Sequence, residues 1–303
     1  MTQCKKIPVL FIIFNRLDLA LRTLAAIRDY APDELYIAAD GWRTDEEKPV
    51  CEQVRSAVLE AVTWTCQVHT LFQEKNLGCG QGPATAITWF FDNVPYGIIL
   101  EDDNVPSSDA FRVCEELLPR YEKDGRIKMI NLSNNFCIRG DTSYMFIRYP
   151  EICGWASWAR AWQEFNYELD LRLMLRRVHP FRCFSFIEAL IRVMLWHRAW
   201  RSDMKKNGRL TFWDYQWSLA IFADRGLCVQ CTANMISNIG FGSGSHCPDS
   251  NHPMSALPYE QMSFPLVHPD VIVSDAKSNR MISRKWLRIF VHNFVSKLRR
   301  STK

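Results

Sequence analysis

The feature that most constrains this 303-residue chain is an apolar strand that runs directly into acidic residues. Residues 97–100 are typical of a buried strand, and Glu101, Asp102 and Asp103 follow at once. Such a strand end lies at the carboxyl edge of a sheet, where open α/β sheets bind their ligands. Clustered carboxylates suit a hard divalent ion such as Mg2+ or Mn2+, which would neutralise a diphosphate. The alternative is a solvated acidic turn in front of a helix.

Apolar strands and amphipathic helices alternate through the first 110 residues. We expect strands at 8–14, 34–39, 67–72 and 96–100, and helices at 18–30, 46–62 and 83–91. This alternation predicts an α/β fold with a mostly parallel, Rossmann-like sheet and helices on both faces. With 48% hydrophobic residues, the chain can form one large domain.

Gly78 and Gly80 form a glycine-bearing turn between the third strand and its helix. The turn has neither the dinucleotide-binding nor the Walker pattern. It therefore indicates a close approach of backbone, and we predict that both glycines contact the ligand.

The second half of the chain is rich in tryptophan. Three indoles, Trp155, Trp158 and Trp162, stand within eight residues. Indoles stack on sugar rings but are more often part of the core; Trp155 is the candidate for a ligand contact. Asp214 stands among aromatic residues, a setting that raises a carboxyl pKa and suits a general base, although it would also cap the following helix.

A glycine-rich loop, residues 238–246, ends at His246. Such a loop can close over phosphates, and His246 would then contact the phosphates or the metal. The alternative is an isolated surface histidine.

The cysteine pattern predicts reduced thiols. Eleven cysteines are scattered without regular spacing, and only Cys228 and Cys231 form a tight pair, which we interpret as two buried thiols on a strand. The apolar run at 7–14 is too short for a signal peptide or a membrane span. These features favour a cytoplasmic location.

The net charge of +4 is unevenly distributed. Residues 276–303 carry nine basic and no acidic residues, which leaves a net charge of −5 on the remainder. Leu287, Val291, Phe294 and Leu298 share one helical face of this tail. A basic amphipathic helix of this kind is typical of attachment to the anionic inner face of a membrane. A helix packed on the domain and a nucleic-acid contact are the alternatives; the aromatic residues among the charges favour the membrane, so we expect no nucleic-acid partner.

Seven ordered segments then form a resemblance that covers residues 7–273. They are PVLFIIFNR, AADG, AITWFF, GIILEDD, RYPEICGWASWARAW, WDYQW and SNIGFG. This series resembles the GT-A-fold nucleotide-diphospho-sugar transferases, and within them a bacterial family labelled hemolytic-protein-like or surface-polysaccharide glycosyltransferases. It is more distantly similar to the metal-dependent, inverting N-acetylglucosaminyltransferase that initiates complex N-glycans.

The resemblance implies a role for each matched residue. Asn15 and Arg16 would meet the diphosphate of a nucleotide-sugar, with UDP-sugar favoured, and Asp40 would meet the base. Glu101 and Asp102 would lie near ribose and sugar, and Asp103 would bind Mn2+ or Mg2+.

The resulting prediction is a metal-dependent, inverting glycosyltransferase that acts on a glycan or lipid-linked acceptor. Residues 1–275 would form the GT-A domain, with a nucleotide-binding half (1–110) and an acceptor half (111–275), and residues 276–303 the basic tail. A sugar-phosphate nucleotidyltransferase and a non-catalytic sugar-nucleotide-binding protein are the alternatives.

Overall fold

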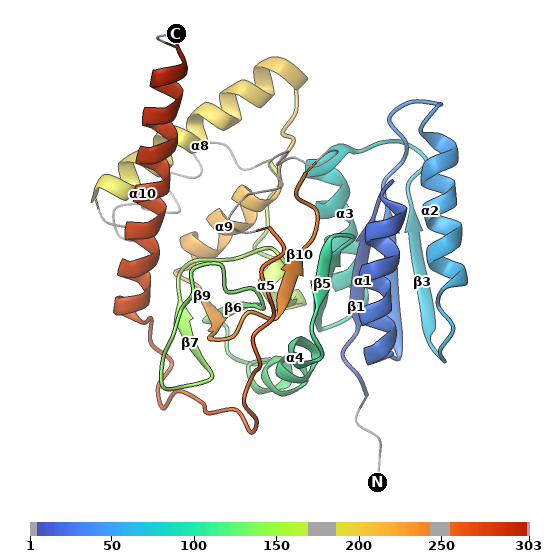
Figure 1. Cartoon of the computed structure of the whole chain (residues 1–303), viewed down its shortest axis with the longest axis horizontal. Coiled ribbons are helices and arrows are strands. Elements are labelled where there is room, and N and C mark those ends of the chain that lie inside the picture. The colour runs from blue at the N-terminus through green and yellow to red at the C-terminus, as the bar shows by residue number, and fades with distance from the viewer. Residues whose placement is uncertain (1–4, 169–185, 243–254, 302–303) are drawn as a thin grey trace.

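The computed structural model describes residues 5–168, 186–242 and 255–301. Its centre is an eight-stranded sheet with the order β3-β2-β1-β4-β8-β6-β9-β7. The strands are β1 (Val9–Ile13), β2 (Glu34–Ala39), β3 (Gln67–Phe72), β4 (Tyr96–Glu101), β6 (Ile127–Asn131), β7 (Tyr144–Ile147), β8 (Trp155–Trp158) and β9 (Leu227–Cys231). Figure 1 shows the sheet passing through the molecule between two layers of helices.

The first half of the sheet is parallel, as the alternation predicts. β1 pairs in parallel with β2 and β4, and β2 pairs in parallel with β3. β8 then runs antiparallel between β4 and β6, β6 pairs in parallel with β9, and β7 closes the edge antiparallel to β9. The predicted mostly parallel, Rossmann-like α/β fold is confirmed.

Helices cover both faces of the sheet. α1 (Leu17–Tyr30) contacts α2 (Lys48–Glu60) and α4 (Ser108–Arg120), whereas α3 (Gly78–Asn93) and the short α5 (Ala159–Trp162) pack together on the other side. The core between them is apolar and closed to solvent. Its side chains include Leu10, Phe11, Phe90 and Phe111, which are all at most 2% exposed. Burial of such side chains stabilises the fold by about 1.5–3 kcal/mol each.

Two features of the second half agree with the sequence-based interpretation. Cys228 and Cys231 are free and fully buried on β9. Trp155, Trp158 and Trp162 are at most 5% exposed and belong to the core.

A small second sheet was not foreseen. β5 (Asn104–Pro106) follows the acidic residues and pairs antiparallel with β10 (Ile236–Asn238). This pairing brings the start of the predicted glycine loop directly onto the acidic turn, because Asn104 and Asn238 are register partners.

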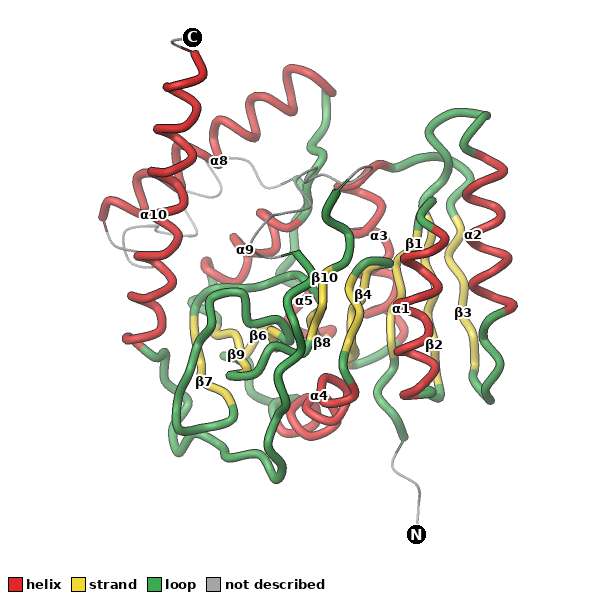
Figure 2. The backbone as a smooth tube through the Cα atoms, in the orientation of Figure 1, coloured by secondary structure: helices red, strands yellow, loops and turns green. Residues whose placement is uncertain are grey.

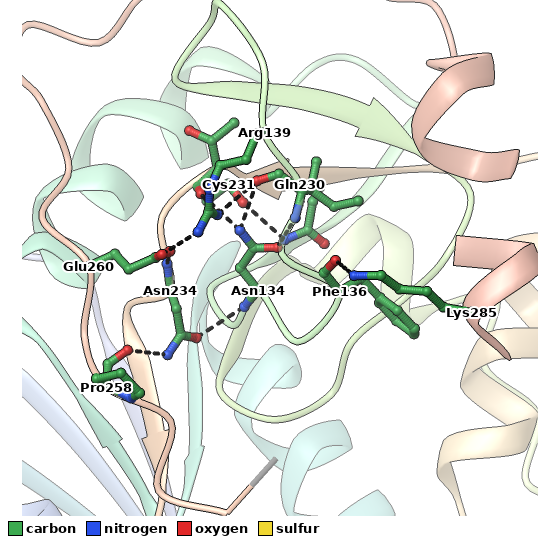
Figure 3. Close-up of polar contacts among 11 residues, drawn as sticks. Asn134, Phe136, Arg139, Gln230, Cys231, Asn234, Pro258, Glu260 and Lys285 are labelled. Carbon is green, nitrogen blue, oxygen red and sulfur yellow. Dashed lines mark hydrogen bonds and ion pairs between the residues drawn. The ribbon is translucent and has the colours of Figure 1, made fainter. Parts of the chain in front are cut away.

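A polar network ties the loops of the second half together (Figure 3). Asn134 N–H donates to the Asn234 side-chain oxygen at 3.0 Å, and Asn234 Nδ2 donates to the Pro258 carbonyl at 2.9 Å. Arg139 forms an ion pair with Glu260 in the same network. The buried side chains of Asn134 and Asn234 thus satisfy backbone groups of these loops.

The C-terminal helix α10 (Ala276–Ser301) begins where the tail was expected to begin. Its first turns pack on the body: Ile282 is fully buried, and Lys285 donates a hydrogen bond to the Phe136 carbonyl (Figure 3). Figures 1 and 2 show the rest of α10 extending away from the sheet. No helix in the described part of the chain combines the length and apolarity needed to cross a bilayer.

Candidate functional site

A cavity of about 770 Å³ opens at the carboxyl ends of β1, β2 and β4. It is also lined by the start of α3, the chain after β10 and residues 209–211. Eight predicted ligand residues line it: Asn15, Arg16, Asp40, Gly78, Gly80, Glu101, Asp102 and Asp103. The residues that directly follow parallel strands lie at the same edge of the sheet. This explains why Asn15 and Asp103, which are 88 positions apart in the sequence, line one cavity.

Arg16 is the centre of the acidic cluster. Its guanidinium donates a 2.8 Å hydrogen bond to Asp103 Oδ2 and a second set of bonds to the Asp102 carboxylate. Asp102 is 3% exposed, and its carbonyl accepts a hydrogen bond from the Thr23 hydroxyl at 2.8 Å. Asp102 therefore positions Arg16, whereas Asp103, which also lines the cavity, is the more exposed of the two carboxylates (13% against 4%).

The cluster holds more negative charge than Arg16 compensates. Burial raises the pKa of Glu101 to about 8, with added repulsion from Asp103 and Asp102, and burial raises the pKa of Asp102 to about 6. Asp214 also raises the Glu101 pKa, so its carboxylate lies within electrostatic range. A bound cation would relieve this repulsion.

The carboxylates that line the cavity could hold a divalent ion only in part. Among the described residues, no group of three His, Cys, Asp or Glu side chains is arranged to hold a metal. Mg2+ and similar ions commonly take one or two carboxylates and complete their shell with phosphate oxygens and water. Asp103 and Glu101, which both line the cavity, are the residues that could hold an ion in this way.

The chain after β10 covers Asp103. Ile239 N–H donates to the Asp103 carbonyl at 2.9 Å, and a Cβ at Gly240 would lie 1.9 Å from Asp103 Oδ2. Only glycine fits at this position. His246 lies outside the described residues, so its predicted contact with metal or phosphate stays a prediction.

Asp40 lines the cavity, but its carboxylate already accepts four hydrogen bonds. The donors are the N–H groups of Gly41, Leu77 and Gly78 and the side-chain amide of Asn76, at 2.8–3.1 Å. Both carboxylate oxygens are therefore occupied. Asp40 holds the start of α3, and a contact with a nucleobase would require this turn to rearrange.

The predicted close approach at the glycine turn is present, and its partner is the protein itself. A Cβ at Gly80 would lie 2.8 Å from the Phe212 backbone nitrogen and 2.6 Å from the Tyr167 hydroxyl. The glycine lets the two halves of the chain meet at the cavity. Gly78, at φ +83°, faces the Arg209 guanidinium.

Trp155 does not line the cavity. It is 1% exposed, and its ring lies 5.9–6.2 Å from the rings of Trp162, Trp213 and Trp217. The Trp155 ring packs against other rings of the core and has no free face. The ligand contact expected for Trp155 is therefore absent from this structure.

Asp214 is the first residue of α9 (Asp214–Ala223) and follows Trp213 of the aromatic cluster. Burial raises the pKa of Asp214, as its aromatic setting predicts, while backbone N–H groups of the helix start oppose this. It does not line the cavity itself, although residues 209–211 do. Asp214 thus lies behind the cavity wall, within electrostatic range of Glu101.

Arg209 is a cavity residue that the sequence patterns did not predict. It is exposed, lines the cavity and follows Gly208, which ends α8 (Phe186–Asn207) at φ +63°. Within the described part of the chain, Arg209 forms no ion pair. The only local signal was a basic residue after a helix-ending glycine, which does not by itself indicate a ligand contact.

The raised Glu101 pKa predicts a pH effect on stability without divalent ions. The folded protein keeps the Glu101 proton up to about pH 8, whereas the unfolded chain releases it near pH 4.3. The free energy of unfolding should therefore fall as pH rises between these values. Glu101→Gln should flatten this slope and stabilise the protein at pH 8 by up to about 4 kcal/mol, the value of a pKa shift of this size. Urea unfolding at both ends of the range tests this, with exposed Glu164→Gln as control; an unchanged slope in Glu101→Gln contradicts it.

The chain resembles known structures at low sequence identity. No family model and no curated protein matches the chain. The solved structures that match include HddC from Yersinia pseudotuberculosis, with 10% identity, a TM-score of 0.33, and coverage of 54% of this chain and 84% of that one. TarS 1-349 from S. aureus matches with 12% identity and a TM-score of 0.33, over 55% of this chain and 54% of that one. Likenesses at this level support no argument about activity.

Proposed function

We propose that this protein is a metal-dependent glycosyltransferase that moves a sugar from a nucleotide-diphospho-sugar, with UDP-sugar favoured, to a glycan or lipid-linked acceptor. The observation that carries the proposal is the Glu101–Asp102–Asp103 turn, paired with Arg16, in a cavity at the carboxyl edge of a parallel sheet. The volume of about 770 Å³ lies within the range of small-molecule sites.

Different residues of the cavity would bind different parts of the donor. Asp103, supported by Glu101, would hold Mn2+ or Mg2+, which when bound supplies positive charge to the departing diphosphate. Arg16 would turn from Asp103 toward the phosphates, since a guanidinium binds phosphate oxygens as readily as carboxylates. Arg209 would bring a second cation from the opposite wall.

The transfer we propose is a single displacement with inversion. The acceptor hydroxyl oxygen forms a bond to the anomeric carbon, the bond from that carbon to the diphosphate breaks, and the nucleoside diphosphate leaves with the electron pair. Asp214 takes the hydroxyl proton as general base, a role that its raised pKa supports. The chain after Asn238 would close over the donor and exclude water.

The acceptor is proposed to lie at the cytoplasmic face of a membrane. Nine basic residues and no acidic ones between 276 and 303 support attachment of α10 to an anionic leaflet. The turns up to Trp286 contact the body or α8, and we propose that α10 meets lipid through the turns that follow.

The test is incubation with a panel of UDP-, GDP-, dTDP- and CMP-sugars plus Mn2+, with detection of free nucleotide. Release of a nucleoside diphosphate from one donor supports the proposal. Release of pyrophosphate from a nucleoside triphosphate and a sugar 1-phosphate would identify a nucleotidyltransferase instead. Donor binding without turnover, with added acceptor glycolipids, would identify a binding protein.

A further inference from the structure

The outer face of α8 carries an exposed apolar stripe that the proposed activity does not use. Ile187, Leu190 and Met194 are 63%, 47% and 54% exposed. Their spacing of three and four residues places them on one line along the helix. Large apolar side chains that line up in solvent indicate an interaction surface more often than isolated ones do.

The same line continues as a row of cations. Arg198, Arg201 and Lys205 follow Met194 at spacings of four, three and four residues, and all three are exposed. We call the six residues from Ile187 to Lys205 on this line the α8 outer row. It is apolar in its first half and basic in its second.

The acidic residues of α8 are engaged elsewhere. Glu188 is fully buried and contacts Tyr149 and Arg192, and Asp203 accepts two 2.7 Å hydrogen bonds from Thr211. The positive charge of the α8 outer row is therefore not neutralised from its own helix.

The inner side of α8 is firmly packed, which leaves the outer row facing away from the body. Ala189 and Trp196 are buried. The helix also crosses α10, because the Arg192 guanidinium lies 4.1 Å from the Trp286 ring centre and Ser283 donates a hydrogen bond to Glu188. Figures 1 and 2 show both helices at one end of the molecule, far from α2 and β3.

We propose that the α8 outer row is a lipid-contacting surface that binds an anionic bilayer. Apolar side chains lie next to cations that form no ion pair with any described residue. This pattern matches an interface in which the apolar half enters the acyl boundary and the basic half meets anionic headgroups. α10 adds positive charge on the same end of the molecule, with Val291 54% exposed. A second copy of the chain is a poorer occupant, because two such positive faces repel each other.

The position of the α8 outer row affects how a substrate would reach the cavity. Only Gly208 separates Asn207, the last residue of α8, from Arg209 on the cavity wall. Docking of α8 on a bilayer would thus hold the cavity close to lipid-linked molecules. The inference does not depend on glycosyl transfer, because lipid binding is measured without any substrate.

The test compares two double variants of the full chain. Leu190→Glu with Met194→Glu changes the outer row, and Val50→Glu with Leu59→Glu makes the same change at exposed positions on α2 (43% and 37% exposed). Co-sedimentation uses vesicles of phosphatidylcholine mixed with phosphatidylglycerol, and vesicles of phosphatidylcholine alone. The outer-row variant should bind the anionic vesicles at least about tenfold more weakly than the α2 variant, which should bind like the wild type.

A second variant tests the charge contribution. Arg201→Gln with Lys205→Gln should weaken binding to the anionic vesicles and reduce its dependence on salt, with no effect on thermal unfolding. Equal binding by the outer-row and α2 variants would overturn the proposal, as would equal binding of the wild type to neutral and anionic vesicles. A wild-type dimer that the outer-row variant converts to a monomer in analytical ultracentrifugation would assign the surface to self-association instead.

Discussion

Replacing Asp103 by alanine is expected to abolish metal-dependent binding of the nucleotide-sugar while the fold stays intact. Asp103 lines the cavity and is more exposed than Asp102, and Arg16 is its partner in the free protein. Without it, an ion has no properly placed charged ligand, and donor affinity in Mn2+ should fall about 10²-fold or more, the effect of losing roughly 3 kcal/mol. Calorimetric titration of the donor with and without Mn2+ measures this.

The control for Asp103 is an aspartate that is exposed and remote from the site. Asp92→Ala, near the end of α3, removes the same charge outside the cavity and should bind the donor like the wild type. Unchanged Mn2+-dependent affinity in Asp103→Ala would remove the metal from the proposed function. Thermal unfolding of both variants separates a loss of ligand binding from a loss of fold.

Replacing Asp214 by asparagine is expected to lower kcat by about 10²-fold or more, with little change in donor affinity. Asparagine keeps the size of the side chain and its hydrogen bonds at the start of α9, but it has no basic carboxylate. Steady-state kinetics with the donor identified in the sugar-nucleotide panel, and a direct measurement of donor binding, separate the two effects.

Glu168→Gln, an exposed carboxylate on the same half of the chain, is the matched control for Asp214. It should leave kcat unchanged. If Asp214→Asn turns over near the wild-type rate, Asp214 is structural, and the next candidates for the base are Glu164 and Asp170, the latter outside the described residues. Since Asp214 does not line the cavity, this experiment also shows whether the acceptor reaches it.

Local patterns predicted the elements of the first half closely. β2 and β3 have the expected bounds, and β1 and β4 differ by a residue or so at their ends. The cause is that continuous apolar runs and amphipathic spacing are properties of neighbouring residues. The acidic turn was predicted from local sequence in the same way. The carboxyl end of a strand in an α/β sheet is a common ligand-binding position, whichever strands lie beside it.

The start of α3 shows where local patterns were insufficient. The glycine turn was expected to precede a helix that begins at Pro83, whereas α3 begins at Gly78. The extra turn is held by the Asp40 carboxylate, which accepts hydrogen bonds from Leu77 and Gly78. A cap supplied from 37 or 38 residues earlier in the chain has no signature in the sequence of the helix itself.

The sequence by itself determined the α/β class, the acidic strand end, the burial of most tryptophans and the basic tail, since each depends on composition or on residues close in the chain. Only the tertiary structure decided which side chains share the cavity. In the folded chain, the Asp40 carboxylate accepts hydrogen bonds at both oxygens, and Trp155 is enclosed in the core. Arg209 lies against Gly78, which is 131 positions earlier in the sequence. The physical reason is that hydrogen-bond partners and burial depend on contacts between distant segments, which folding alone brings together.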